Sequence, residues 1–322
     1  MSDRLINRIL VVDDEKPYRE LLAEILLTWG YTCEVAADAF EALDLLSQGR
    51  FDLVISDIRM QGKDGLELMR EARETFPQLD FIIMTGYAPE YSYTDVISAG
   101  ATDFICKPFQ LTELEAKLGR IERENQNIRR LQVILEETLD ALASALEMKD
   151  PYTAGHQRRV ATLACAIAME MGLSTAMIDT IRMAALVHDI GKLSVPAEIL
   201  TKPTKLKETE VNLVKDHAQT TYDILSKVEF PWPIAQIGLQ HHERMDGSGY
   251  PHGLSGTDIL LEARIIAVAD VVESMGTHRP YRAALGMDRT LEEITMNRGI
   301  LYDAEVVDAC LKLFVEKGYK LD

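Results

Sequence analysis

Short runs of apolar and β-branched residues alternate with amphipathic helical patterns along the first third of the chain. The strand candidates are residues 9–12, 33–36, 53–56, 81–85 and 103–106. Strands that alternate with helices form a parallel sheet, because each helix returns the chain to the same end of the sheet. The pattern predicts an α/β domain with a doubly wound, five-stranded parallel sheet over residues 1–118.

The next segment has an apolar residue at every seventh position. The residues with this spacing are Leu114, Ile121, Ile128, Leu135 and Leu142, and neither Gly nor Pro occurs from 120 to 150. A seven-residue repeat indicates a coiled coil. We expect a long helix over residues 119–147 that joins two domains and forms a parallel homodimer. An amphipathic helix that packs only against its own domains is the alternative.

The rest of the chain, residues 148–322, loses the strand pattern and shows helical periodicity instead. Amphipathic helices are expected over residues 154–171, 175–187, 208–228, 234–242 and 262–275. Apolar residues in these segments recur at intervals of three and four, which is the spacing of one helix face. This half is therefore predicted to be an all-α helical bundle.

Composition and charge narrow the classes of function. The chain has 322 residues, of which 47% are hydrophobic, and this amount of apolar material suits two folded domains. Its net charge of −18 argues against direct DNA binding, which needs Lys and Arg against the phosphates. The four scattered cysteines fit a reducing compartment. Because no apolar run is long enough for a membrane helix, we expect no membrane insertion and a cytoplasmic protein.

Polar side chains follow the predicted strands of the first domain. They are Asp13, Asp14, Asp57, Thr85 and Lys107. The carboxyl ends of parallel strands share one edge of the sheet, so these side chains are expected to converge there. Three carboxylates at one point favour Mg²⁺, and Asp57 could then attack phosphorus with Lys107 compensating charge. Asp and Thr are also common turn formers, so any one of these residues could simply end a strand. A turn-forming role explains the whole set poorly.

With these residues, the first domain resembles the receiver domain of response regulators, which has a flavodoxin-like fold. The resemblance implies that Asp57 is the phospho-acceptor and that Asp13 and Asp14 hold Mg²⁺. It also implies that Thr85 and Phe104 form the switch pair that reports phosphorylation. A sensor histidine kinase is then the expected partner.

Five of the seven histidines lie in or at the ends of the predicted helices of the second half. They share faces with apolar residues: His156 is in line with Val160 and Ile167, and Asp270 follows Ile266. Burying unpaired polar groups costs several kcal/mol each. Two divalent transition metal ions would pair with them, and such ligands suit Fe, Mn, Co, Ni or Zn. Any single histidine could instead be an ordinary hydrogen-bonded core residue.

The order of these residues resembles the HD-GYP phosphodiesterase family, of the HD type of helical bundle. The matching residues are His156, His188-Asp189, Lys192, His217, His241-His242, the segment Asp246-Gly-Ser-Gly-Tyr-Pro251, and Asp270. The resemblance implies two metal ions, with Fe or Mn favoured over Ni, Co or Zn. Asp189 is then the bridging ligand, and His156, His188, His217, His241, His242 and Asp270 are terminal ligands.

The catalytic and substrate-binding roles also come from this resemblance. It implies that the metal ions bridged by Asp189 activate a water molecule, which attacks cyclic di-GMP to give the linear dinucleotide or GMP. Lys192 is then expected near the phosphate. Tyr250, Arg279 and Arg282 match positions that contact the substrate, although each could equally be a local structural residue. Some members place a Glu where this chain has Tyr152 and bind a third metal ion, so two are expected here. Another departure is Glu273, which stands where many members have Asp.

The sequence thus predicts a response regulator whose phosphorylation at Asp57 controls hydrolysis of cyclic di-GMP. One alternative is a low-turnover sensor of cyclic dinucleotides or a protein-interaction scaffold. Another is a hydrolase of a different cyclic dinucleotide, which the pocket residues do not exclude.

Overall fold

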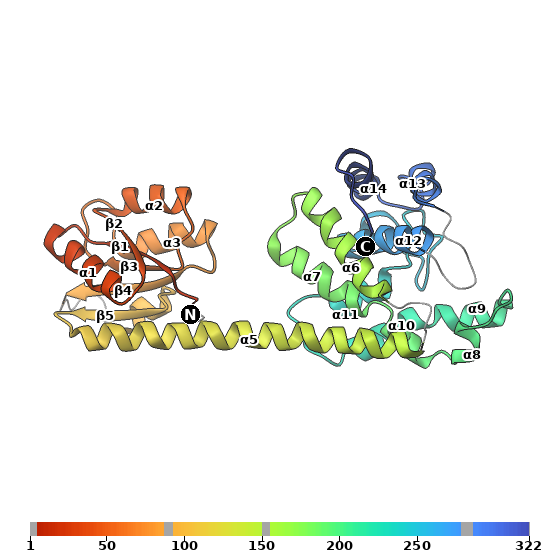
Figure 1. The fold of residues 1–322 in the computed structure, drawn as a ribbon, viewed down its shortest axis with the longest axis horizontal. Helices are drawn as coiled ribbons and strands as arrows, with labels where there is room; N and C mark the ends of the chain where they lie inside the picture. Colours follow the sequence, from red (N-terminus) through yellow and green to blue (C-terminus); the bar gives the residue numbers. More distant parts are fainter. Residues whose placement is uncertain (1–4, 87–92, 150–154, 278–285, 322) are drawn as a thin grey trace. The chain divides into compact units, whose positions relative to one another are not determined.

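The computed structural model describes residues 5–86, 93–149, 155–277 and 286–321. The chain divides into two units, residues 1–132 and 133–322, each with its own hydrophobic core. Figure 1 shows an α/β first unit and a helical second unit.

The first unit contains the predicted parallel sheet. Its strands are β1 (Arg8–Val12), β2 (Thr32–Ala36), β3 (Leu53–Asp57), β4 (Asp80–Gly86) and β5 (Asp103–Lys107). All neighbours are parallel, in the order β2-β1-β3-β4-β5. The register pairs Val12 with Ser56, so the residues that follow, Asp13 and Asp57, leave the sheet side by side. The predicted fold of this unit is confirmed.

Helices cover both faces of this sheet (Figure 1). The helices α2 (Ala39–Gln48), α3 (Gly65–Thr75) and α4 (Tyr93–Ser98) pack on one face. On the other face lie α1 (Lys16–Thr28) and the first turns of α5 (Leu111–Lys149). The three central strands, β1, β3 and β4, therefore consist mostly of buried residues, as expected for a parallel sheet covered on both sides.

The long helix α5 contains the whole predicted linker and begins earlier, at Leu111. The residues of its seven-residue repeat lie in different environments. Leu114 and Ile121 are buried in the core of the first unit, so these positions are not free for a second chain. Ile128 is 56% exposed and Leu142 is 40% exposed. Because Leu135 packs on the core of the second unit, Ile128 and Leu142 are the repeat positions that are open to a partner helix.

The second unit is helical, as predicted. Its α-helices are α6 (His156–Glu170), α7 (Thr175–Val187), α8 (Ala197–Leu200), α9 (Glu208–Lys215), α10 (His217–Leu225), α11 (Ile234–Gln240), α12 (Leu261–Gly276), α13 (Met287–Met296) and α14 (Ala304–Leu311). The short elements are η2 (Ile190–Ser194), η3 (Gly256–Asp258) and the π-helical η4 (Lys312–Glu316). Buried apolar residues of α6, α7, α11, α12 and α14 form the core.

The expected single helix over residues 208–228 is wrong. The chain forms two helices there, α9 and α10, with a break at Asp216. The carbonyl of Val214 accepts a hydrogen bond from Nδ1 of the His217 ring at 2.5 Å. The His217 side chain thus occupies a carbonyl group of the last turn of α9. The break turns His217 inward, where it is 1% exposed.

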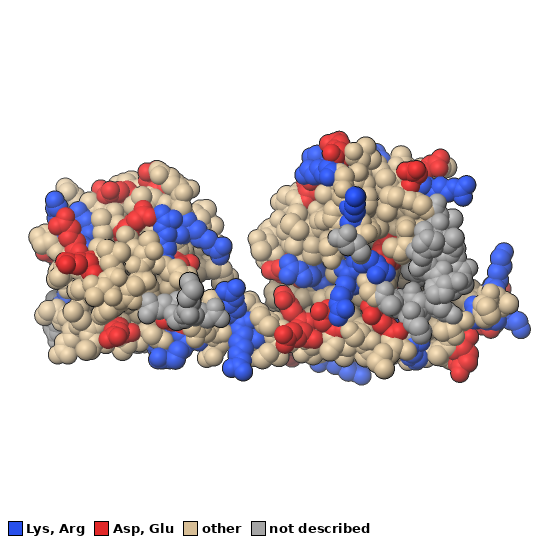
Figure 2. All heavy atoms as spheres, viewed as in Figure 1, with Lys and Arg blue, Asp and Glu red and all other residues tan. Residues whose placement is uncertain are grey.

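The surface carries both signs of charge. Figure 2 shows Lys and Arg side chains interspersed with Asp and Glu over the visible face of each unit. Within the described part of the chain, no helix is both long and apolar enough to span a lipid bilayer.

Candidate functional site

The carboxyl edge of the sheet in the first unit gathers the predicted acidic residues. One carboxylate oxygen from each of Asp13, Asp14 and Asp57 lies within 4.8 Å of the other two. Lys107 Nζ, at the end of β5, lies 2.6 Å from Asp13 Oδ2 and 3.0 Å from Asp57 Oδ2. The edge thus has oxygen ligands suited to Mg²⁺ and an ammonium beside the carboxylate of Asp57.

Two opposing effects act on the Asp57 carboxyl group. Burial raises its pKa, and the hydrogen bond and charge of Lys107 oppose that rise. The backbone N–H of Ile58 also donates to Asp57 Oδ1 at 2.9 Å. This oxygen is held in place, while Oδ2 faces Lys107 and the acidic cluster.

The predicted switch residues lie on neighbouring strands. Thr85 on β4 is buried, and its hydroxyl donates to the carbonyl of Gly86 at 2.9 Å. Phe104 on β5 pairs with Ile83, two residues before Thr85, so both side chains point to the same face of the sheet. Lys117 Nζ lies 5.3 Å from the centre of the Phe104 ring.

The second unit brings all seven predicted metal ligands into two adjoining groups. One consists of Asp189, His217, His241 and His242, and the other of His156, His188 and Asp270. In each group, one ligand atom per residue lies within 4.8 Å of all the others. These residues come from α6, the end of α7, α10, the end of α11, and α12.

Asp189 lies where the two groups meet. Its Oδ1 is 3.2 Å from His217 Nε2, in its own group, and 3.8 Å from His241 Nε2. Its Oδ2 is 3.5 Å from His188 Nε2, in the other group. The same Oδ2 accepts a hydrogen bond from Lys192 Nζ at 2.5 Å. Each oxygen therefore faces a different group, which is the geometry that a bridging carboxylate needs.

Backbone hydrogen bonds fix the orientation of three of the imidazoles. Nδ1 donates to the carbonyl three residues earlier in His188 (Ala185, 2.6 Å), His217 (Val214, 2.5 Å) and His241 (Gly238, 2.6 Å). Because a carbonyl can only accept, the proton is on Nδ1 and Nε2 keeps its lone pair. These three Nε2 atoms therefore point their lone pairs into the site, as metal ligands do.

His156 is held by a carboxylate instead. Its Nδ1 contacts the carboxylate of the buried Glu273, and its Nε2 lies 3.2 Å from Asp270 Oδ1. Arg159 Nε donates to Glu273 Oε1 at 2.8 Å. Burial lowers the pKa of His156, but Asp270 and Glu273 outweigh it and raise this pKa to about 9. Carboxylates thus face both ring nitrogens of His156, Glu273 at Nδ1 and Asp270 at Nε2.

The protonation states of the remaining groups favour metal binding. Burial lowers the pKa of His188, His241 and His242, which keeps these rings neutral. Burial opposes ionisation of Asp189 and Asp270, but neighbouring cationic and imidazole groups hold both pKa values well below the usual range. Neutral imidazoles and ionised carboxylates are the forms that bind metals.

A buried ligand atom of the site has no hydrogen-bond partner in the described part of the chain, and a metal ion would supply a partner. Nε2 of His188 is buried and has no hydrogen-bond partner among the described residues. Leaving such an atom unpaired costs about 1–3 kcal/mol. This atom and the donor set together show that the site fits divalent transition metals, with Asp189 between the two groups.

Two glycines allow the helices to approach closely enough to form the site. A Cβ on Gly191 would lie 2.0 Å from the His217 carbonyl oxygen, and one on Gly238 would lie 2.6 Å from Thr221 Cγ2. Thr221 joins the same elements, because its hydroxyl accepts from Gly191 N at 2.9 Å and donates to His188 O at 3.1 Å. Larger residues at either glycine would push the ligand-bearing elements apart.

Sequence reasoning missed several residues that support the ligands. Arg159 lies at a polar position of its helix and gave no signal. Thr221 lies on the buried face of α10 with His217 and Leu225, but nothing in the sequence marked its hydroxyl as a support for the ligands. Glu243 directly follows the two adjacent histidines, and this position was the one hint in the sequence that it supports the ligands. The structure shows that its side chain is buried. Its carboxylate accepts from the backbone N–H groups of His252 at 2.8 Å and Leu254 at 3.0 Å.

The predicted substrate-binding residues are only partly visible. The ring of Tyr250 lies beside His242, with 4.6 Å between ring centres, and Lys215 Nζ lies 5.1 Å from the Tyr250 ring centre. Arg279 and Arg282 lie outside the described residues, and so does Tyr152.

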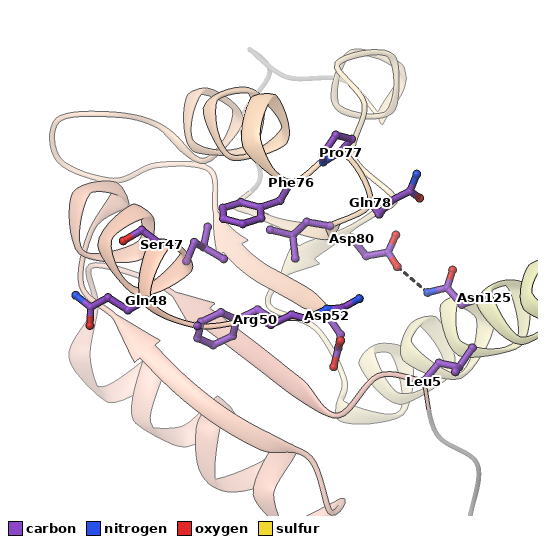
Figure 3. Close-up of a pocket in the computed structure, with 14 residues that line it drawn as sticks. Leu5, Ser47, Gln48, Arg50, Asp52, Phe76, Pro77, Gln78, Asp80 and Asn125 are labelled. Atoms are coloured by element: carbon purple, nitrogen blue, oxygen red, sulfur yellow. Dashed lines mark hydrogen bonds between the residues drawn. The ribbon is translucent and has the colours of Figure 1, made fainter. Parts of the chain in front are cut away.

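A hollow of about 570 Å³ lies at the opposite edge of the sheet from Asp57 (Figure 3). The loops before β3 and β4 line it, with Asn125 of α5, whose amide donates to Asp80 Oδ2 at 2.8 Å. None of the predicted site residues lines this hollow. Its size therefore says nothing about the chemistry of either site.

Comparisons with known proteins agree with the two-unit architecture. Residues 9–119 match the response regulator receiver domain, and residues 140–306 match the HD domain. The chain is 36% identical to the cyclic di-GMP phosphodiesterase response regulator RpfG of Xanthomonas campestris, over 94% of this chain and 87% of that protein. It is 32% identical to a cyclic di-GMP phosphodiesterase of Thermotoga maritima, over 95% of this chain and 90% of that protein.

A third relative has a different named substrate. The 3'3'-cGAMP-specific phosphodiesterase 3 of Vibrio cholerae is 42% identical over 178 residues, which cover 55% of this chain and 39% of that protein.

Proposed function

Since the chain belongs to the response regulators that join a receiver domain to an HD domain, we propose that it hydrolyses cyclic di-GMP with an HD-GYP metal centre under the control of Asp57. The observation that carries the proposal is the position of Asp189 between two groups of metal ligands. The named activities of the relatives in Xanthomonas and Thermotoga support the substrate.

The chain's own residues have defined tasks in this proposal. Bound metal ions would supply Lewis acidity and a nucleophilic hydroxide at neutral pH. Asp189 and the six terminal ligands would hold the metal ions. The positive charge of these ions would allow an acidic chain to bind an anionic substrate. Lys192, whose ammonium lies 2.5 Å from Asp189 Oδ2, adds a further positive charge beside the reacting phosphate. Fe or Mn is the proposed metal, with Ni, Co or Zn as alternatives.

Control by phosphorylation belongs to the acidic edge of the receiver unit. We propose that Asp57 accepts a phosphoryl group from a sensor histidine kinase, with Mg²⁺ on Asp13 and Asp14. Lys107 would then pair with the phosphoryl oxygens, and Thr85 and Phe104 would respond to the new charge. Support comes from the cluster of three carboxylates around the Lys107 ammonium.

A homodimer through α5 is also proposed. The support is a run of apolar side chains on the middle of the helix, where Ile128, Leu131 and Ile134 are 56%, 66% and 47% exposed. Seating a second helix on these residues would remove them from water. The mass of the protein in solution, measured by light scattering, should be that of a dimer for the wild type and of a monomer for Leu131→Lys.

A related substrate is the second candidate. The identity of 42% to a 3'3'-cGAMP-specific phosphodiesterase over 178 residues favours this possibility. It keeps the same metal centre and changes only the base that the pocket accepts.

One experiment separates these functions. Purified full-length protein loaded with Fe or Mn is incubated with cyclic di-GMP, 3'3'-cGAMP and cyclic di-AMP, and the products are separated by chromatography. We expect cyclic di-GMP to be hydrolysed fastest and the His188→Ala, Asp189→Ala double variant to be inactive. Faster hydrolysis of 3'3'-cGAMP would favour the second candidate. A metal-loaded protein that cleaves none of the three would contradict an enzymatic role and favour a sensor or scaffold.

A further inference from the structure

Among the five site histidines, His242 is the exception in how its ring is held. Nδ1 donates to a backbone carbonyl in three of them, and Nδ1 of His156 contacts Glu273. Within the described residues, the His242 ring makes no such hydrogen bond. Another contact must therefore fix the direction of its lone pair.

Ring packing supplies that contact. The centres of the His242 and Tyr250 rings are 4.6 Å apart, with 30° between the ring planes. A short separation with a tilt of 30° brings the faces of the two rings against each other, which we call the stack of Tyr250 on His242. The His242 ring also packs against the His241 ring, with 3.9 Å between ring centres and 43° between ring planes. Rotation of His242 about its side-chain bonds would break the stack with Tyr250.

The loop that carries Tyr250 is attached to the backbone of His242 itself. The N–H of Tyr250 donates to the His242 carbonyl at 3.3 Å. A Cβ on Gly249 would lie 2.5 Å from that carbonyl oxygen and 2.4 Å from Glu243 Cα, so only glycine fits between them. The Gly249-Tyr250 pair is thereby pressed against the residue whose ring it covers.

A buried carboxylate fastens the far side of the same loop. Glu243, the residue after His242, is 2% exposed. Its two carboxylate oxygens accept the backbone N–H groups of His252 at 2.8 Å and Leu254 at 3.0 Å. Hydrogen bonds from backbone N–H groups to a carboxylate are among the stronger ones in proteins. The loop is thus held on both sides of Tyr250.

From this geometry we infer that Tyr250 is a positioning residue for metal binding, whose ring orients His242, and that Glu243 keeps the loop in place. The inference rests on the metal centre proposed above. It gives Tyr250 a task that is separate from any contact of its hydroxyl group with the substrate.

Two substitutions of Tyr250 separate these tasks. Tyr250→Phe keeps the ring and removes the hydroxyl, whereas Tyr250→Leu removes the aromatic face. The affinity of the full-length protein for Mn²⁺ is measured by competition with a chelator, with no cyclic dinucleotide present. We expect Tyr250→Leu to bind Mn²⁺ about 10–100-fold more weakly and Tyr250→Phe to bind it like the wild type.

The Glu243→Gln variant tests the other half of the inference. Its amide keeps one acceptor oxygen, so we expect a weaker but measurable loss of Mn²⁺ affinity. The matched control is Asp246→Asn, because among the described residues the Asp246 side chain accepts hydrogen bonds from Ser248 alone, from its N–H and its hydroxyl. This control should leave Mn²⁺ affinity unchanged. Thermal unfolding of the metal-free variants identifies any substitution that disrupts the fold. If Tyr250→Leu does so, the Mn²⁺ affinity of Glu243→Gln tests the inference instead.

The results can contradict the inference without touching the proposed function. Wild-type Mn²⁺ affinity in both Tyr250→Leu and Glu243→Gln would overturn the inference. A rise in KM for both Tyr250 variants, with no change in Mn²⁺ affinity, would also overturn it and assign Tyr250 to the substrate alone. Weakened Mn²⁺ binding in a protein that cleaves no cyclic dinucleotide would support the inference and refute the proposed activity.

Discussion

The acidic edge of the first unit and the histidine cluster of the second both bury polar groups, but they neutralise them differently. At the edge, the chain supplies its own cation, because Lys107 lies 2.6 Å from Asp13 and 3.0 Å from Asp57. In the cluster, Nε2 of His188 is buried without a hydrogen-bond partner among the described residues. The chain thus supplies a cation at both sites, since Lys192 also pairs with Asp189, but the cluster also holds a buried imidazole lone pair that a metal ion would satisfy. This difference suits the proposed roles of the two sites, one in switching and the other in catalysis.

The largest effect is expected where the helices of the cluster approach most closely. In Gly191→Ala, the new methyl group would clash with the His217 carbonyl, 2.0 Å away, and push the ligands apart. We expect a loss of about 2 kcal/mol or more in stability and loss of bound metal. Thermal unfolding and metal analysis provide the readouts.

The matched control for this change is Gly119→Ala. Gly119 lies within α5, and its nearest contact to a new Cβ is the end of the flexible Arg123 side chain at 3.5 Å. Alanine is a better helix former than glycine, so stability should stay the same or rise slightly. Equal effects at Gly191 and Gly119 would contradict the role of close helix approach.

A smaller and more selective effect is expected at the acidic edge. Asp57→Asn removes the proposed phospho-acceptor and changes none of the metal ligands of the second unit. Basal hydrolysis of cyclic di-GMP should therefore stay within about twofold of the wild type, while its response to a small phosphodonor disappears. Hydrolysis is assayed with and without the phosphodonor. A variant that still responds would show that Asp57 is not the switch.

The smallest effect is a pH dependence at the base of β5. Burial alone would raise the pKa of Asp103, but hydrogen bonds from Lys117 and Arg120 outweigh it and lower the pKa. A lowered pKa in the folded state gives stability that is present above the unfolded value of about 3.9 and is lost as pH falls through the folded value.

Asp103→Asn should therefore cost about 1 kcal/mol at neutral pH and little at acidic pH. The free energy of unfolding of the full chain is measured from pH 7 down to pH 3. The exposed Glu74→Gln serves as control and should follow the wild type. A pH-independent loss in Asp103→Asn would mean that packing, and not charge, is responsible.

The two sites also differ in how far the sequence alone predicts them. At the sheet edge, parallel topology determines which residues meet, so Asp13, Asp57 and Lys107 could be placed together from strand positions alone. The histidine ligands could be picked out because their spacing resembles a known motif. In both cases a short pattern carries the information.

The supporting contacts could not be predicted, because they join residues far apart in the chain. Glu273 contacts His156 and Arg159 across more than a hundred positions, and no local pattern records that pairing. The break at Asp216 was missed for a similar reason, since the apolar period continues through it. His217 was expected among the ligands, but the helix break that turns it inward is seen only in the folded structure.

The most direct test of the central claim is the metal content of the purified full-length protein after exhaustive removal of loosely bound ions. The two groups of ligands around Asp189 predict two transition metal ions per chain, and none in the His188→Ala, Asp189→Ala double variant. A wild-type protein that retains no transition metal, or a double variant that retains as much as the wild type, would contradict the claim.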